Sequence, residues 1–412
     1  MESRAPAPTL RLHHGDTYLF TFEAEILDVR EDSGGGLSVA LDRTAFYPES
    51  GGQPSDRGIL AGREVNGLSE ESGVVWHALG PEIGLELRRG LTVHGEIDAD
   101  LRLDHMQQHT GQHILSAAFV KIGDRPTVSF HLGREESTID LSGPPLEADD
   151  LRAVEEEANA SVLRDVPIRI HAVPRSELDR FPLRREPGEE HEILRVIEIE
   201  GIDWSACGGT HARRTGEVGP IHILGMEKSK NLRRVRFLAG KRALCWMAEA
   251  HAVLEAVARE GSIRFQDLPE AARAWKEASA SAEREVRALR SELGRLEGER
   301  LFAASGPDPD GVRRIGLILE SAATEQIRAM ANAITASGPA MVLIGGRSGD
   351  RSLWVAARSE KLPERTGDWN AAQALRAFLA PLGGNGGGSA FFAQGTSPSE
   401  AGGDPSGIFR RD

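Results

Sequence analysis

The chain has 412 residues, too many for one ordinary hydrophobic core, so we expect several domains. With 40% apolar and 27% charged residues the composition is globular, and no apolar run reaches the roughly 18 residues of a membrane span. The net charge of −14 argues against a nucleic-acid partner unless basic residues gather in one region. Two cysteines exclude a disulfide framework and residues 1–10 contain no apolar signal core, so we expect a cytoplasmic protein.

Residues 1–98 predict a small β-barrel domain, because short segments rich in β-formers alternate with glycine turns such as 32–36. The strands are expected at 18–29, 37–41, 73–79 and 91–97. Phe-Tyr-Pro-Glu-Ser-Gly-Gly-Gln at 46–53 interrupts this pattern. Its proline and glycines are typical of a structural turn.

Residues 99–240 mix helices with strands, which indicates an α+β domain. Few helix breakers occur from 104 to 119, so this stretch predicts a helix, and residues 146–163 have the pattern of an acidic amphipathic helix. The strands are expected at 127–131, 137–141, 166–173, 193–199 and 221–226.

Two pairs of metal-capable residues occur in this second domain. His109 and His113 are four apart, so on a helix both imidazoles lie on one face. Cys207 and His211 flank Gly-Gly-Thr, which favours a tight turn that presents both side chains to one point. One thiolate and three imidazoles suit tetrahedral zinc. Because His105 precedes His109 by four residues, spacing alone does not choose which pair binds metal.

A basic segment follows directly on this turn. From His211 to Arg242 nine basic residues face only two acidic ones, and such a segment beside a metal site suits a phosphate backbone. A solvated basic face is the ordinary alternative. The nine residues are Arg213, Arg214, Lys228, Lys230, Arg233, Arg234, Arg236, Lys241 and Arg242.

Residues 241–304 predict two helices, with a break at Gly261-Ser262 and a new start at Asp267-Leu268-Pro269. In the second helix apolar and small residues recur at spacings of four and three, which is a heptad seam. The seam indicates either two antiparallel helices or a homodimer contact. Its members are Trp275, Ser279, Ala282, Val286, Leu289, Leu293 and Leu296.

Residues 305–412 have the alternating pattern of an α/β domain after a linker at 305–311. Glycines at 345 and 346 predict a turn that extends to residue 350. A second run, Gly383-Gly-Asn-Gly-Gly-Gly388, predicts a loop whose exposed N–H groups suit phosphate binding. A flexible linker would have the same composition.

Four stretches resemble motifs of the alanyl-tRNA editing proteins, the free-standing AlaX family related to the editing domain of alanyl-tRNA synthetase. These are the segment 46–53, His109-xxx-His113, Cys207-xxx-His211 and the glycines from 383 to 388 with Gln394-Gly395. The resemblance covers nearly the whole chain and is closest to long forms that end in a DHHA1 domain. Two departures are Ser50 in place of a glycine and Asn385 where a basic residue is common.

The resemblance implies four parts in an α+β multidomain chain. They are a β-barrel domain (1–98), an editing domain like the second additional domain of tRNA synthetases (99–240), a helical hairpin or coiled coil (241–304) and an α/β DHHA1 domain (305–412). It also implies one Zn²⁺ held by His109, His113, Cys207 and His211. A homodimer through the helical or C-terminal region is a further expectation.

The implied activity is hydrolysis of the ester of mischarged tRNA(Ala), chiefly Ser-tRNA(Ala), with Gly-tRNA(Ala) as a second substrate. Whether zinc activates water or only positions the substrate stays open. The alternative is a zinc-containing RNA-binding module without hydrolysis. Thr110 follows His109, so the glutamate of a HExxH metalloprotease is absent, and no Asp-His-His triplet supports a phosphoesterase.

The expected site residues fall into two groups beside the metal ligands. Polar residues near the metal helix and on the following strand are the candidates for chemistry and for reading the substrate hydroxyl: Gln112 and Ser129. Contacts to substrate and tRNA are expected from Gly51, Gly52, Gln53, Thr110, Arg233, Arg234, Gly384, Gly386 and Gly387.

Overall fold

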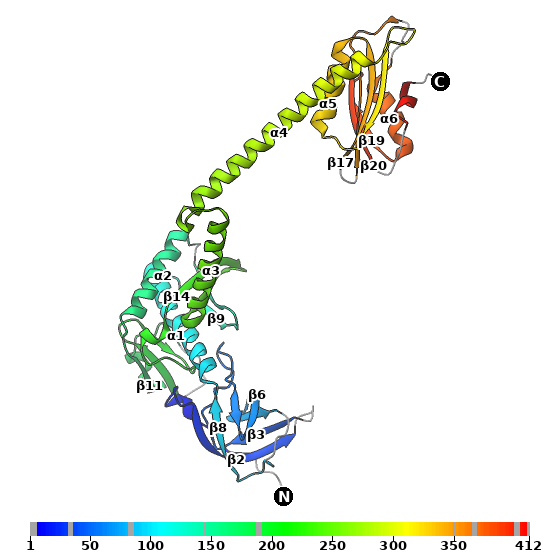
Figure 1. The fold of residues 1–412 in the computed structure, drawn as a ribbon. Coiled ribbons are helices and arrows are strands. Elements are labelled where there is room, and N and C mark those ends of the chain that lie inside the picture. The colour runs from blue at the N-terminus through cyan, green and yellow to red at the C-terminus, as the bar shows by residue number, and fades with distance from the viewer. Residues whose placement is uncertain are drawn as a thin grey trace. The chain divides into compact units, whose positions relative to one another are not determined.

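The computed structural model describes residues 6–31, 36–80, 86–143, 146–186, 192–348, 351–364, 369–398 and 404–409. The chain divides into two compact units, Met1–Val257 and Ala258–Asp412 (Figure 1). Sheets and helices occur in both units, so the expected α+β multidomain class is confirmed. The finer four-part division stays a prediction. Among the described residues, none of the helices combines the length and hydropathy needed to cross a bilayer.

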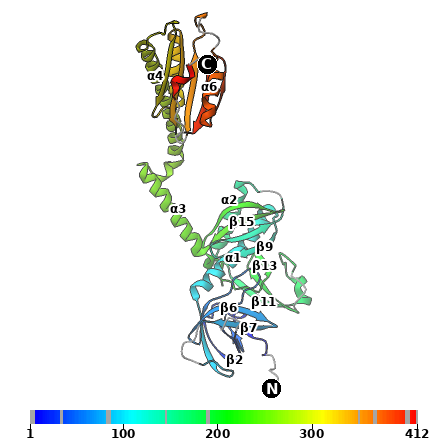
Figure 2. The same ribbon diagram turned by 90° about the vertical axis from the view of Figure 1, so that its right-hand side faces the viewer.

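Six strands near the N-terminus hydrogen-bond in a closed ring, and Figure 2 shows three of them, β2, β6 and β7, at that end of the first unit. Alternate residues of β2 and β8 are buried, because one face of each strand contacts the barrel interior with Phe22, Ile26 and Leu60. The turn expected at 32–36 lies mostly outside the described residues. In ring order the strands are β2 (Thr21–Glu31), β3 (Leu37–Leu41), β7 (Val74–Leu79), β6 (Arg63–Glu71), β5 (Gly58–Leu60) and β8 (Thr92–Ile97).

Helix α1 (Ala99–Gly123) is the centre of the rest of the first unit. It is longer than the predicted 104–119 because Asp98 caps its start by accepting from Leu101 N, and Asp124 ends it in a left-handed conformation. Most of its middle turns are buried, since α2 (Ala148–Leu163) and two sheets pack around it. The helix therefore holds its polar residues inside the unit.

The two sheets of this region carry the segments that surround α1. The four-stranded sheet has the order β14 (Ile221–Ser229), β15 (Leu232–Ala239), β10 (Ser137–Leu141), β9 (Thr127–Leu132). The three-stranded sheet has the order β11 (Ile168–Pro174), β12 (Ile193–Ile199), β13 (Asp203–Ala206). The Cys207–His211 turn directly follows β13, and because β13 packs against α1, the turn lies beside that helix.

Helix α3 (Gly240–Glu260) ends and α4 (Leu268–Ala304) begins where the sequence predicted a break. The heptad seam of α4 is exposed, with Trp275 at 46% and Leu289 at 63%. Instead α4 packs on α5 (Thr324–Ser337) through Gly294 and Gly298, whose added Cβ atoms would lie 2.2 and 2.5 Å from backbone oxygens of α5. The seam and the α5 contact thus use different residues of the helix.

The second unit contains a five-stranded sheet and α6 (Ala371–Leu379). Its strands are, in order, β16 (Arg313–Leu319), β17 (Ala340–Ser348), β18 (Arg351–Arg358), β20 (Phe392–Pro398) and β19 (Asn385–Gly388). The predicted turn from Gly345 is wrong at its start, since β17 continues to Ser348. An added Cβ at Gly345 would lie 2.5 Å from the Trp354 ring, so tertiary packing requires a glycine inside this strand.

The prediction of a loop across the second glycine run is also wrong. Asn385–Gly388 is the edge strand β19, paired antiparallel with β20. Gly395 on β20 allows this, because an added Cβ there would lie 2.4 Å from Leu379 Cδ1 and 2.5 Å from Asn385 O. The glycines therefore let α6 and two strands approach closely.

Candidate metal centre and adjoining pocket

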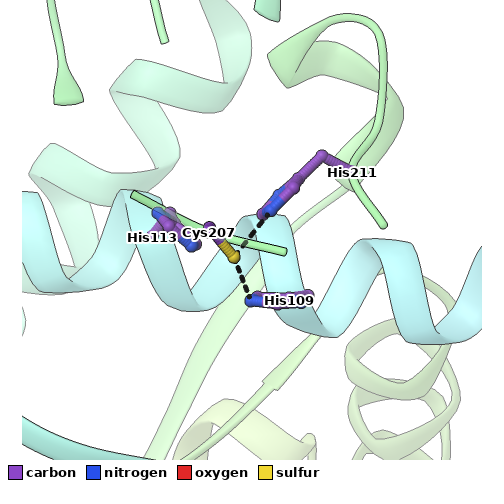
Figure 3. Close-up of side chains that lie close together, drawn as sticks. All are labelled: His109, His113, Cys207 and His211. Atoms are coloured by element: carbon purple, nitrogen blue, oxygen red, sulfur yellow. Dashed lines mark hydrogen bonds between the residues drawn. The ribbon is translucent and has the colours of Figure 1, made fainter. Parts of the chain in front are cut away.

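Three imidazoles and one thiol converge inside the first unit (Figure 3). His109 and His113 project from successive turns of α1, with ring centroids 5.3 Å apart. Cys207 and His211 come from the turn after β13. One ligand atom of each residue lies within 4.8 Å of the others, so the group can hold a metal ion. His105 is not part of it, so the structure selects the pair that spacing left open.

The spacing of the donor atoms fits tetrahedral coordination. Cys207 Sγ lies 3.3 Å from Nε2 of His109 and 3.3 Å from Nε2 of His211. Bonds of about 2.3 Å to sulfur and 2.0 Å to nitrogen would separate such donors by about 3.5 Å in a tetrahedron. One sulfur and three imidazole nitrogens are also a donor set that zinc prefers.

The charges at the centre favour the metal-binding form of the cysteine. Burial raises the pKa of the Cys207 thiol, but the neighbouring His109 and His211 outweigh it and lower that pKa well below its usual range. Burial also dominates at His211 and lowers its pKa to about 3. Both directions favour the forms that bind a metal, which are a deprotonated thiol and a neutral imidazole.

Each histidine is oriented by a partner on its Nδ1 atom. His109 Nδ1 lies 2.7 Å from Gln53 Oε1, and His113 Nδ1 lies 3.0 Å from Asp203 Oδ2. The third contact, from His211 Nδ1 to Thr110 Oγ1, is 3.3 Å. All three Nε2 atoms are thereby left for the centre.

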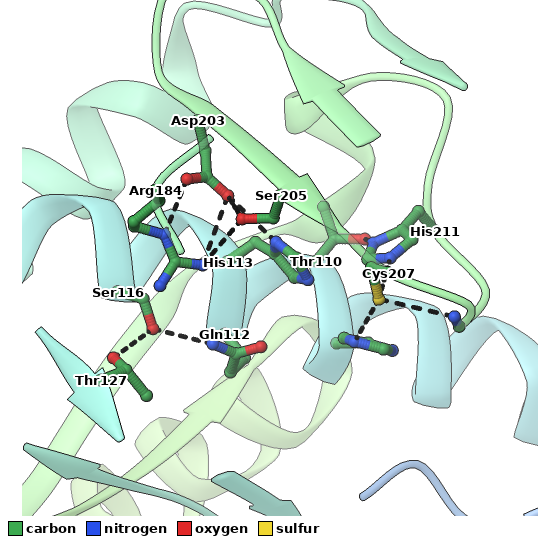
Figure 4. Close-up of polar contacts among 12 residues, drawn as sticks. Thr110, Gln112, His113, Ser116, Thr127, Arg184, Asp203, Ser205, Cys207 and His211 are labelled. Atoms are coloured by element: carbon green, nitrogen blue, oxygen red, sulfur yellow. Dashed lines mark hydrogen bonds and ion pairs between the residues drawn. The ribbon is translucent and has the colours of Figure 1, made fainter. Parts of the chain in front are cut away.

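Asp203 is the functional residue that the sequence reading missed. Its carboxylate is buried and contacts Arg184 Nε at 2.7 Å and Ser205 Oγ at 2.8 Å, as well as His113 (Figure 4). Burial lowers the pKa of His113, but the bond to Asp203 contributes most to raising it, to about 9. The only sequence signal is an acidic residue four positions before Cys207.

A cavity of about 270 Å³ adjoins the metal centre. Gln112 is one of the residues that line this cavity, and its side chain is only 2% exposed. Gln112 Nε2 donates to Ser116 Oγ at 2.8 Å, while Gln112 Oε1 has no hydrogen-bond partner among the described residues (Figure 4). A buried acceptor without a partner indicates a place for a ligand donor. The lining residues are Gln112, His113, Thr127, Val128, Ser129, Phe130, Arg184, Arg185, Glu186, Ser205, Ala206 and Cys207.

The 46–53 segment lies beside the centre. Gly51 and Gly52 adopt positive φ angles of 56° and 85°, and Gly52 O accepts from Leu132 N on β9 at 3.0 Å. Gln53 is fully buried, and its contacts are His109 and Thr210. Of the three, Gln53 is therefore the one in contact with a metal-site residue.

The basic segment is largely neutralised by acidic partners. Arg213, Arg214, Arg234, Arg236 and Arg242 each form an ion pair. Arg234 holds Asp140, which also accepts from Ser129 Oγ at 2.8 Å, so these two predicted site residues share a carboxylate. Within the described part of the chain, no ion pair involves Lys228, Lys230, Arg233 or Lys241. Gly384, Gly386 and Gly387 belong to the second unit.

Comparison with known families gives two matches in the first unit. The family described as the threonyl and alanyl tRNA synthetase second additional domain matches residues 194–236. This range begins in β12 and includes the Cys207–His211 turn. The family of class II (A) tRNA synthetases matches residues 17–101, which include the barrel.

Curated relatives extend the similarity. Alanyl-tRNA editing protein AlaX-L of Pyrococcus horikoshii is 37% identical over 250 residues, which are 58% of this chain and 60% of that protein. The alanine–tRNA ligase of Korarchaeum cryptofilum is 31% identical over 422 residues, 100% of this chain and 46% of the ligase. The chain thus spans less than two thirds of the length of these relatives. The matches confirm the resemblance that the motifs indicated.

A solved structure shares part of the sequence. The C-Ala domain of Aquifex aeolicus alanyl-tRNA synthetase is 28% identical, covering 21% of this chain and 76% of that domain. Its TM-score of 0.19 is too low to bear on the fold.

Proposed function

We propose that this relative of the AlaX-type alanyl-tRNA editing proteins is itself an aminoacyl-tRNA deacylase. Its substrate would be mischarged tRNA(Ala), chiefly Ser-tRNA(Ala), with Gly-tRNA(Ala) as a second one. The observation that carries the proposal is the group of His109, His113, Cys207 and His211 beside a polar pocket. A zinc site with a structural role alone would not require a neighbouring pocket with an unpaired acceptor.

One Zn²⁺ per chain is the proposed metal, held by these four side chains. When bound, zinc would supply positive charge that holds and polarises the ester. Four protein donors complete a tetrahedron, so we assign the site to positioning rather than to generating hydroxide. Asp203 fixes the orientation of the His113 ring through its contact with Nδ1, and Thr110 contacts His211.

Editing is needed because size selection alone cannot remove the wrong amino acid. A synthetase pocket rejects an added hydroxyl by only about 10²-fold, whereas a site that binds that hydroxyl can reject the analogue lacking it by about 10⁴-fold. Gln112 offers such a group in the pocket. We assign Gln112 to the serine hydroxyl and Ser129 to the same pocket wall.

Contacts to tRNA are proposed for basic side chains without an acidic partner. Arg233, Lys228 and Lys230 meet this condition in the described residues and lie on or between β14 and β15. Arg234 meets this condition only if its ion pair with Asp140 is broken. For the second unit we propose a DHHA1-type domain whose strand β19 contacts RNA and whose α4 seam forms a homodimer.

The test is hydrolysis of Ser-tRNA(Ala), followed as release of labelled serine under single-turnover conditions. The parent protein should release serine much faster than alanine from Ala-tRNA(Ala). The variant His113→Ala should lose this activity. The variant Arg236→Gln should retain it, because Arg236 lies on β15, in the same sheet as the pocket strand β9, but does not line the pocket. A protein that binds tRNA(Ala) and zinc but releases no serine would be an RNA-binding module instead.

A further inference from the structure

Gln53 is buried at the junction of the barrel and the metal centre. It is 0% exposed and lies at the end of the 46–53 segment, 56 residues before His109. Its Oε1 accepts from Thr210 N at 3.0 Å, and its Nε2 donates to Thr210 Oγ1 at 2.9 Å. The side-chain amide is therefore held at both ends by the turn that carries Cys207 and His211.

These contacts determine the hydrogen-bond polarity of His109. A backbone N–H can only donate, so the atom facing Thr210 N is the oxygen of Gln53. That same oxygen lies 2.7 Å from His109 Nδ1, so Nδ1 must carry the proton. In the metal-binding form of the ring, the lone pair is then on Nε2, the atom that lies 3.3 Å from Cys207 Sγ.

Gly209 packs tightly against the contact between Gln53 and His109. An added Cβ at Gly209 would lie 2.1 Å from His109 Cε1 and 2.8 Å from Gln53 Oε1. The loop itself is anchored by Asp56, which accepts from Tyr47 N at 2.6 Å and pairs with the fully buried Arg102 of α1. The amide oxygen is thus a fixed part of the centre.

We propose that Gln53 is a positioning residue of the metal centre, which sets the tautomer and ring angle of His109, and that it does not touch substrate. The proposal rests on the metal site assigned above. It also makes the N-terminal barrel a component of that site, because the barrel's loop supplies the atom that orients a ligand. This role differs from the expected contact between Gln53 and the substrate, because the Gln53 side chain is 0% exposed and faces His109 and Thr210.

The test compares metal affinity in the full chain. Gln53→Met keeps the length of the side chain but removes the acceptor, and Gln53→Glu restores an acceptor for both donors. Gln108→Met is the matched control, because Gln108 is equally buried on α1 but bonds no residue of the metal centre. Its partners are Ala239, at 2.8 and 3.0 Å, and Asp104 Oδ1, at 3.4 Å. Zinc affinity is measured by competition with a chromophoric chelator, and the ligand field by the visible spectrum of the Co²⁺ form.

Gln53→Met is expected to bind zinc about 10–100-fold more weakly and to change the Co²⁺ spectrum, as loss of a ligand's orienting partner does. Gln53→Glu should recover most of the affinity, and Gln108→Met should bind like the parent although it is less stable. Equal affinity and an unchanged spectrum in Gln53→Met would overturn the proposal. A parent that binds no metal would overturn the metal site as well.

A measurement on the unaltered protein guards against a variant that does not fold. In the zinc-loaded parent, ¹⁵N correlation spectra of the histidine rings should show His109 protonated at Nδ1 and bound through Nε2. The reverse assignment would refute the role of Gln53 without any substitution.

Discussion

Replacing Gln112 by methionine is expected to lower the deacylation activity without lowering the free energy of unfolding by more than about 1 kcal/mol. In the folded chain Gln112 Nε2 donates to Ser116, while Gln112 Oε1 is buried without a partner among the described residues. A buried unpaired acceptor costs about 1–3 kcal/mol, and the bond to Ser116 contributes about 1 kcal/mol. Rotating the amide by 180° would exchange the bonded atom but would still leave one polar atom unpaired.

The free energy of unfolding should therefore change by less than about 1 kcal/mol, or rise, in Gln112→Met, since both polar groups are lost together. Activity should respond differently. If Oε1 receives the serine hydroxyl, loss of that bond should lower kcat/KM for Ser-tRNA(Ala) by about 10–100-fold, equivalent to roughly 1.4–2.7 kcal/mol. Release of alanine from Ala-tRNA(Ala) should be unchanged, because alanine has no hydroxyl to lose.

The assay pairs urea unfolding with single-turnover deacylation of both tRNAs. Gln108→Met is the control, since it leaves Ala239 N–H and C=O without their partner and should cost about 2–3 kcal/mol of stability without changing the ratio of the two rates. Equal falls in serine and alanine release in Gln112→Met would refute the reasoning and leave discrimination to another residue.

Further expectations concern the metal, the RNA, the units and pH. Cys207→Ala should lose or weaken zinc, measured by metal content after dialysis; full occupancy in a folded variant would remove the thiolate from the ligand set. The slope of log K for tRNA binding against log salt concentration should become shallower by about one unit in Arg233→Gln. The change should be smaller in Arg236→Gln, because Arg236 is already paired with Glu136. A protein ending at Val257 should keep its zinc, because all four donors lie in the first unit; an inability to bind zinc would contradict this. Burial lowers the pKa of His77 from 6.5 to about 4, so between these pH values only the unfolded chain takes up this proton. The contribution of His77 to the free energy of unfolding should therefore fall by about 1.4 kcal/mol per pH unit from pH 6.5 down to pH 4. In urea titrations across that range His77→Gln should show a shallower slope, and an identical slope would rule out this cause.

The sequence was enough to predict the parts of the candidate metal centre, because spacing gave the possible pairs and the family resemblance chose His109 and His113 over His105. His109 and His113 are four apart in a stretch without breakers, and the helix that forms there does place both on one face. Cys207 and His211 flank two glycines, and they do converge across a turn. Such predictions succeed because helix periodicity and glycine turns depend on neighbouring residues alone.

Tertiary structure decided the surroundings of those parts. Strand pairing sets Asp140 directly opposite Arg234, so a residue that looked free for phosphate is neutralised by a partner 94 positions away. In the second unit, packing of Leu379 against Gly395 turns the glycine run into the strand β19 rather than a loop. Neither contact leaves a periodic trace in the sequence.

The sequence by itself was enough to predict which side chains converge at the candidate metal centre, while only the tertiary structure decided how they are held. Gln53 and Asp203 lie 56 and 90 positions from the histidines they contact, and nothing local marks either as a hydrogen-bond partner. The candidate donors could be predicted because they lie on one helix and one turn, although the family resemblance was needed to set His105 aside. The atoms that orient those donors come from other elements, and their contacts exist only after the barrel, α1 and β13 have packed together.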